Sequence, residues 1–435
     1  MSAKQNLMHH RTILLALALT FGVTVVLAAR MFPGPPTDTD PRANTPNDPD
    51  FDKAEPDDPD CPSASGCDGC PSGCSVFDEQ HRLFGFAPSQ TRSSAIYRDP
   101  GNPSRVGQPQ ISGVSADLAW KLSIGEQTTG IAICDTGVRW EREELRRRIR
   151  LNTGELPVPC GPTAGQKGRP LAEYDCDGDG IFTPDDYGAP SVTDPMLRVQ
   201  PNEGPHGDPT KLDGEDVIVH FSDGVDDDHN GFVDDIAGWD FFDDDNNPFD
   251  ASSYSSAGNH GSGRASDALA EGNNGLSGIG LCPQCRLVPV RIWDTFVPDP
   301  NNFALCMLYA ADNGIQVVEA AIGAVTTTEF AQTATQYAYE HGVALMEVSS
   351  DLNTADHNSP TNFNNTIFVK GTVADAEGAS MDVNRPPFPQ VALTSPVGTW
   401  FRDSNLTQYG GHAEPRERSA QVHPAVAEVL VPARL

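Results

Sequence analysis

Short apolar runs alternate with stretches of helical spacing over the middle of the chain. Five apolar runs cover residues 131–134, 287–293, 315–322, 343–348 and 366–370. Stretches of helical spacing lie ahead of the first run, at 113–122, and between later runs, at 304–313 and 328–341. Because buried parallel strands read as short apolar runs bounded by turn residues, the alternation predicts an α/β fold. We expect a mostly parallel sheet with helices on both faces.

The first apolar run ends on an acid. Asp135 follows Cys134 directly and is itself followed by Thr136 and Gly137. An Asp at the carboxyl end of a parallel strand lies where open α/β sheets build their sites. The same residues also fit an ordinary Asp turn, so this signal is weak by itself.

A histidine at the start of a helix strengthens that signal. Asn259 and His260 introduce a Gly-rich stretch that continues as a small-residue helix to Ala270. The apolar run at 287–293 follows. A histidine that opens a helix, downstream of an Asp that closes a strand, is typical of a charge-relay arrangement.

These motifs resemble those of the subtilisin-like serine peptidases. The family's Asp motif is similar to residues 133–138, and its His-Gly-Thr motif is similar to residues 260–262. The resemblance extends from about residue 114 to about residue 411. It includes Ala321-Ile322-Gly323, which resembles a segment that lines the family's substrate cleft. The resemblance implies that Asp135 and His260 are catalytic and that proteins or peptides are the substrates.

The family's nucleophile motif, Gly-Thr-Ser, does not occur in this sequence. With one inserted residue, Ser419 and Pro424 fall near the motif, but Glu417 and Arg418 replace Gly and Thr. The resemblance therefore makes Ser419 the candidate catalytic serine. A truncated or frameshifted C-terminus explains the altered motif as well as divergence does.

The family's oxyanion Asn is replaced by Asp351 in this resemblance. An ionised carboxylate cannot donate a hydrogen bond to a developing oxyanion, whereas an amide can. We therefore expect the chain to hydrolyse peptides very poorly. The competing hypothesis is a catalytically inactive or truncated protein of peptidase fold that acts as a calcium-binding module.

Two acidic loops lie in a long insertion, residues 151–250. Each alternates acidic or amide side chains with other residues and then has a Gly, the pattern with which tightly turned loops supply oxygen ligands to Ca²⁺. A solvated acidic turn is the alternative. The candidate calcium ligands are Asp175, Asp177, Asp179 and Asp186 in the first loop and Asp226, Asp228, Asn230 and Asp235 in the second.

The N-terminal part is expected to fall into three segments. Residues 1–29 carry basic residues and then an apolar stretch, which predicts a signal peptide or, as the alternative, an uncleaved membrane anchor. Residues 30–60 are rich in Pro and Asp and predict a disordered linker. Residues 61–112 begin with a Cys-rich tract that predicts either a small disulfide knot or a metal site at Cys61, Cys67, Cys70 and Cys74.

The charge and the cysteine content indicate which partners and which cellular compartment the chain fits. The 435-residue chain has 29 basic and 61 acidic residues, a formal net charge of −32, which argues against nucleic acid or an anionic membrane surface as a partner. Export past the N-terminal segment makes the ten cysteines compatible with disulfides. The peptidase-like domain is expected over 113–435, in a secreted or cell-surface protein.

Overall fold

The computed structural model describes most of the predicted peptidase-like domain. The described residues are 48, 83, 114, 116–120, 122–251, 259–294, 299–323, 327–348 and 358–369, with the backbone of 372–373 and 402–403. None of the helices in these ranges combines the length and apolar character that crossing a lipid bilayer requires. The predicted signal segment, and nearly all of the linker and the Cys-rich tract, lie outside the described residues.

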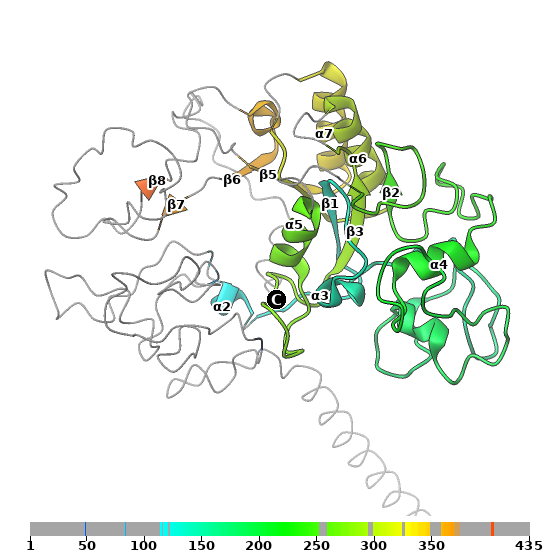
Figure 1. The fold of residues 1–435 in the computed structure, drawn as a ribbon. Helices are drawn as coiled ribbons and strands as arrows, with labels where there is room; N and C mark the ends of the chain where they lie inside the picture. The colour runs from blue at the N-terminus through cyan, green and yellow to red at the C-terminus, as the bar shows by residue number, and fades with distance from the viewer. Residues whose placement is uncertain are drawn as a thin grey trace, which may run out of the picture.

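A six-stranded parallel sheet forms the centre of the molecule (Figure 1). Its spatial order is β2-β3-β1-β4-β5-β6, and every pair of neighbours is parallel. The strands are β1 (Gly130–Asp135), β2 (Trp239–Asp240), β3 (Arg286–Arg291), β4 (Val317–Ala320), β5 (Ala344–Val348) and β6 (Thr366–Val369). A separate antiparallel pair joins β7 (Thr372–Val373) to β8 (Arg402–Asp403). The predicted α/β class is confirmed.

Strand β1 lies inside the sheet, and its residues 131–134 are apolar on both faces. Its residues pair with β3 from Gly130 opposite Arg286 to Asp135 opposite Arg291. On its other edge Ile131 pairs with Val317 of β4. All six residues of β1 are buried, so the strand needs an apolar layer on each side.

Helices supply those two layers. On one face, α5 (His260–Leu269) and the short α3 (Glu143–Arg146) contribute Leu145 and Leu269 to a core with Ile131 and Ile133. On the other face lie α6 (Pro300–Asp312) and α7 (Glu329–Glu340), which pack against Ala132, Cys134 and the outer strands (Figure 1). A disulfide between Cys134 and Cys306 links β1 to α6.

Local signals explain where the helices begin. Helix α6 starts at Pro300, earlier than the apolar spacing predicts, because the Asp299 side chain accepts a hydrogen bond from Asn301 N at 2.8 Å. The Thr328 side chain caps α7 by accepting from Ala331 N at 3.1 Å. Helix α2 (Ala116–Ala119) is shorter than the expected helix at 113–122.

The insertion at 151–250 forms a lobe beside the sheet that is mostly loop (Figure 1). Its regular elements are short: η5 (Leu171–Glu173), η6 (Pro184–Gly188), α4 (Gly214–Phe221) and strand β2. Tyr174, Phe182 and Tyr187 are nevertheless buried and belong to the same core as Ile131 and Ile133. The lobe is therefore packed against the sheet through aromatic side chains.

Candidate active site

Asp135 lies at the carboxyl end of β1 and is fully buried. Its Oδ1 accepts a hydrogen bond from Thr136 N at 2.7 Å. Strand β1 is held on both edges, so the position of this carboxylate is set by the centre of the sheet. The strand pairing therefore fixes the backbone from which this carboxylate projects.

His260 is the first residue of α5, and its ring faces Asp135. Nδ1 lies 2.8 Å from Asp135 Oδ1 and 2.9 Å from Oδ2. An ionised carboxylate only accepts hydrogen bonds, so Nδ1 is the protonated nitrogen in this pair. The expectation that the two side chains lie within hydrogen-bond reach is confirmed, while their catalytic role stays a prediction.

The approach of α5 to β1 requires the glycine after His260. A Cβ atom added to Gly261 would overlap the carbonyl oxygen of Gly137 and lie 3.1 Å from the Asp135 Cβ. Gly261 N instead donates to Thr136 Oγ1 at 3.0 Å. The Asp-Thr-Gly and His-Gly motifs are therefore in direct contact, which places the imidazole over the carboxylate.

Sequence reasoning missed one residue that supports this contact. Asp250 is fully buried, and its Oδ2 accepts from Thr136 Oγ1 at 3.2 Å and from Asn259 N at 2.7 Å. It thus joins the turn after β1 to the residue that precedes His260. No local motif marks Asp250, because it lies within a dense acidic tract.

Two further acids lie near Asp135, Glu319 on β4 and Glu347 on β5. Glu319 on β4 pairs across the backbone with Ile133, and its Oε2 is buried without a hydrogen-bond partner. Burial, and then the nearby Asp135, raise the pKa of Glu319 to about 8. Glu347 on β5 is also buried, which raises its pKa well above the ordinary value, although Asn358 Nδ2 donates to its Oε1 at 2.9 Å.

The predicted nucleophile and the predicted oxyanion position cannot be placed. Ser419 and Asp351 both lie outside the described residues. Gly323, from the segment that resembles the family's cleft strand, is exposed just beyond the end of β4. The described half of the candidate site is therefore the Asp135–His260 pair and the ends of strands β1 and β4.

A cavity of about 660 Å³ lies elsewhere, at the amino ends of the strands. Gln127 and Gln316 from that edge line it, together with Phe182 of the first acidic loop and Asp228 of the second. Neither Asp135 nor His260 lines it, so it is separate from the candidate relay.

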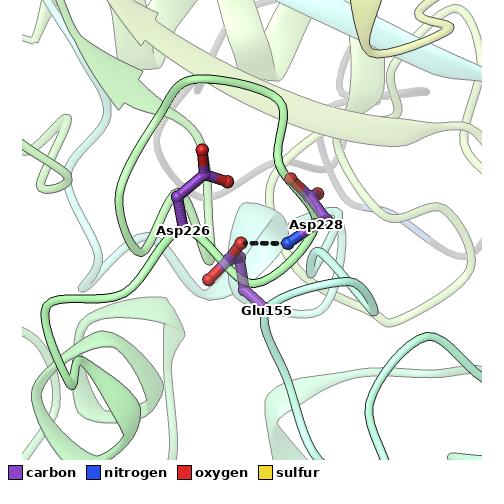
Figure 2. Close-up of side chains that lie close together, drawn as sticks. All are labelled: Glu155, Asp226 and Asp228. Atoms are coloured by element: carbon purple, nitrogen blue, oxygen red, sulfur yellow. Dashed lines mark hydrogen bonds between the residues drawn. The ribbon is translucent and has the colours of Figure 1, made fainter.

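The second acidic loop brings together only part of its predicted ligand set. One carboxylate oxygen from each of Asp226, Asp228 and Glu155 lies within 4.8 Å of the others (Figure 2). Asp235 instead accepts hydrogen bonds from Tyr309 Oη at 2.8 Å and from the Asn152 and Asn230 side chains. Glu155 comes from outside the loop, and the spacing within the loop gave no signal for it.

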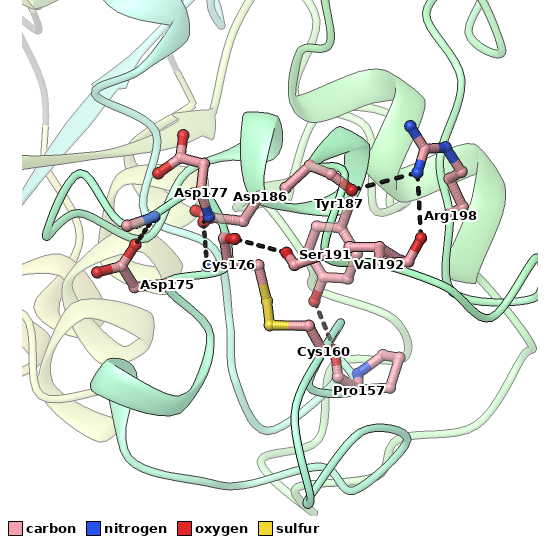
Figure 3. The surroundings of a disulfide bond; sticks show 12 residues. Pro157, Cys160, Asp175, Cys176, Asp177, Asp186, Tyr187, Ser191, Val192 and Arg198 are labelled. Carbon is pink, nitrogen blue, oxygen red and sulfur yellow. Dashed lines mark hydrogen bonds between the residues drawn. A yellow bond between two sulfur atoms is a disulfide. The ribbon is translucent and has the colours of Figure 1, made fainter.

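The first acidic loop is stapled by a disulfide between Cys160 and Cys176 (Figure 3). Cys176 lies between Asp175 and Asp177, whose carboxylate oxygens group with one of Asp186 within 4.8 Å. Asp186 Oδ1 accepts from Cys176 N at 2.6 Å. The fourth predicted ligand, Asp179, is absent from the group and forms an ion pair with Arg147. Whether any of these residues binds a metal stays a prediction.

Comparison with known proteins gives matches to serine proteinases. The chain is 30% identical over 135 residues to a thermophilic serine proteinase from Bacillus sp. (strain AK1), covering 31% of this chain and 32% of that protein. It is 27% identical over 203 residues to thermitase from Thermoactinomyces vulgaris, covering 42% of this chain and 69% of thermitase. The chain thus spans about a third of the first relative's length.

A solved structure titled as proteases from Pseudoalteromonas arctica PAMC 21717 is also similar. It is 17% identical to this chain, covers 60% of each chain and has a TM-score of 0.34. The sequence model of the subtilase family, Peptidase S8, aligns with residues 126–420. That range contains Asp135 and His260 and extends through the predicted position of Ser419. The chain therefore belongs to the subtilase family of serine peptidases.

Proposed function

We propose that this chain is an exported serine endopeptidase that uses Asp135, His260 and Ser419 as a relay. The observation that carries the proposal is the buried Asp135 carboxylate held 2.8 Å from His260 Nδ1. This geometry fixes the imidazole tautomer in which Nε2 has the lone pair, and Nε2 is the nitrogen that a general base needs.

In the proposed reaction, the Ser419 hydroxyl oxygen attacks the carbonyl carbon of a peptide bond and its proton passes to His260 Nε2. The proton then moves to the leaving amine as the C–N bond breaks, and a water molecule hydrolyses the resulting ester by the same proton transfers. Asp135 stays ionised and stabilises the imidazolium that forms.

We expect this chain to be a slow enzyme. Asp351 replaces an oxyanion donor, a loss that costs about 2.7–4 kcal/mol of barrier, and Ser419 lacks the Gly-Thr that precedes the family's nucleophile. The full chain with calcium should hydrolyse casein weakly and react slowly with a fluorophosphonate probe. Mass spectrometry should place the label on Ser419, and the label should be lost in Ser419→Ala but kept in the matched control Ser404→Ala.

Two other outcomes would contradict this proposal. A folded, calcium-loaded chain in which no serine is labelled would favour an inactive calcium-binding module. Rapid casein hydrolysis that disappears in Ser419→Ala would keep the relay but overturn the expected low rate, and with it the significance given to Asp351.

We also propose that the acidic loops at 175–186 and 226–235 bind Ca²⁺ and stabilise the fold. The support is the two groups of carboxylate oxygens, each containing three residues within 4.8 Å. Hard cations such as Ca²⁺ prefer oxygen ligands of this kind. The ion would neutralise carboxylates that otherwise repel one another, which makes its expected effect one on stability rather than on the chemical step.

Removing calcium should lower the melting temperature. A ligand at a hundredfold excess over its Kd adds about 2.7 kcal/mol to the free energy of unfolding, which corresponds to roughly 4 °C for a domain of about 300 residues. The measurement compares melting with calcium and with chelator at equal ionic strength. Asp175→Asn should reduce the shift, whereas Glu173→Gln, which removes one nearby charge outside the group, should not. If the melting temperature of the wild-type chain is the same with calcium and with chelator, the loops are solvated turns and do not bind calcium.

Export is proposed from the N-terminal pattern and supported by the disulfides. Besides the two disulfides already described, Cys282 pairs with Cys285. Disulfides persist in oxidising compartments, so these three bonds fit a secreted or cell-surface protein. Attachment to a membrane would arise only from an uncleaved segment 1–29, and the pairing or metal content of the tract 61–74 stays a prediction.

A further inference from the structure

Glu155 is a buried acid that pairs with no Lys or Arg among the described residues. It lies in the first part of the insertion, and only 1% of its surface is exposed. Its Oε1 accepts hydrogen bonds from Asp227 N at 2.9 Å and Asp228 N at 3.1 Å. Its Oε2 is buried and has no hydrogen-bond partner. A carboxylate oxygen left in this state costs free energy, so it requires an explanation.

That carboxylate points into the second acidic loop. In Figure 2, Glu155 reaches the loop from a neighbouring segment, and its oxygen that accepts from Asp228 N is the one on the side of Asp226 and Asp228. The three residues offer oxygens within 4.8 Å of one another. No Lys or Arg of the described residues forms an ion pair with any of them, since Lys167 pairs with Asp223 and Asp227 instead.

A glycine next to Glu155 allows Asp228 to lie close to the Glu155 backbone. The Asp228 Cβ lies only 2.5 Å from where a Cβ would stand on Gly154, so a side chain at that position would displace Asp228. Asn152 Nδ2 donates to Asp228 Oδ2 at 2.9 Å and further fixes that carboxylate. The loop folds its own peptide N–H groups onto Asp226, whose oxygens accept from Asn230 N and Gly231 N.

We infer that Glu155 is a calcium ligand, and that one Ca²⁺ joins it to Asp226 and Asp228. Ca²⁺ takes oxygen ligands at about 2.3–2.6 Å, so oxygens that bind one ion lie no more than about 5 Å apart. The three oxygens here meet that condition, because they lie within 4.8 Å of one another. The ion would lie among the three grouped carboxylate oxygens, at the Glu155 oxygen that Figure 2 draws nearer to Asp226 and Asp228. This inference rests on the proposal that the loop 226–235 binds calcium, and it is independent of peptidase activity.

The site differs from a loop that binds calcium by itself. Glu155 and Asp226 lie near opposite ends of the insertion, with the first acidic loop and α4 between them in the sequence. A cation bound by both Glu155 and Asp226 would link the two ends of the insertion and hold the lobe against the sheet. Because the ion would bind the folded chain and be released on unfolding, it would stabilise this arrangement by mass action.

The test is calcium titration by calorimetry on the full chain and on three variants. Glu155→Gln keeps an oxygen that can accept from the Asp227 and Asp228 amides but removes the charge. Loss of a residue that only hydrogen-bonds to a metal ligand lowers metal affinity by roughly 10–100-fold. Because Glu155 is proposed as a ligand itself, the calcium affinity of Glu155→Gln at this site should fall by at least that factor. Asp226→Asn should give a similar loss, whereas the matched control Asp227→Asn, from the same loop but outside the group, should not.

Melting measurements separate this role from a purely structural one. In chelator, Glu155→Gln should be at least as stable as the wild-type chain, because a buried charge has been removed. With calcium, it should be less stable than the wild-type chain. Equal destabilisation with and without calcium would overturn the inference in favour of a structural hydrogen-bond role.

The failure of the inference is distinguishable from the failure of the calcium proposal. If the wild-type chain binds no calcium, both fail. If Asp226→Asn loses calcium while Glu155→Gln retains the wild-type affinity, only the role of Glu155 is wrong, and the loop binds its ion alone.

Discussion

Asp135→Asn should lower the rate at which Ser419 reacts by about 10⁴-fold, the scale of loss that follows when the acid of such a relay becomes an amide. The buried carboxylate accepts from His260 Nδ1 through two oxygens at 2.8 and 2.9 Å. An asparagine can turn its NH₂ group toward Nδ1, which then has to be the unprotonated nitrogen. Nε2 would carry the proton and could not accept another from the serine.

The measurement is fluorophosphonate labelling of Ser419 followed by mass spectrometry. Labelling suits a slow enzyme, and we expect no labelled peptide from Asp135→Asn when the wild-type chain is fully labelled. Asp267→Asn is the matched control, because it removes one charge from α5 but leaves the pair intact. Melting in calcium shows that each variant is folded. Labelling of Asp135→Asn at the wild-type rate would mean that the pair does not activate Ser419.

Glu319→Gln should make the chain's stability less dependent on pH. Desolvation, and then the nearby Asp135, raise the pKa of the Glu319 carboxyl from its ordinary value of 4.5 to about 8. Between those pH values the folded state binds a proton that the unfolded chain has released. The stability of the wild-type chain therefore falls as pH rises from 4.5 through 8, and it is highest with respect to this group below pH 4.5.

Glutamine removes this contribution because it does not titrate. The free energy of unfolding of Glu319→Gln minus that of the wild-type chain should therefore grow by roughly 3 kcal/mol between pH 4 and pH 7. Urea unfolding at several pH values in that window measures it. Glu340→Gln, at the exposed end of α7, is the matched control and should show no comparable growth. A constant difference for Glu319→Gln would mean that Glu319 is ionised in the folded protein.

The order of strands and helices was predictable from the sequence because burial imposes a local pattern. The run at 131–134 predicted β1, and the runs at 315–322 and 343–348 predicted β4 and β5 to within a few residues. Asp135 and His260 were predictable for the same reason. Each follows or begins a regular element, and the parallel topology brings the end of β1 next to the start of α5.

The insertion was predictable only in part. The acidic alternation marks the loops, but the burial of Tyr174 and Tyr187 has no periodic signal, because short turns rather than long helices carry these side chains. The same limit applies to the cysteines. Their number suggests disulfides, but which cysteines pair depends on which loops pack together.

The sequence by itself determined the fold class, the positions of Asp135 and His260, and the two acidic loops, because each depends on residues close together in the chain. Only the tertiary structure decided that Asp250 supports the His260 turn, that Glu319 lies near Asp135, and that Glu155 groups with Asp226 and Asp228. These contacts join segments far apart in the sequence. The spacing of apolar residues indicates which face of a helix or strand is buried. Which distant side chain contacts that face is decided only when the elements pack together.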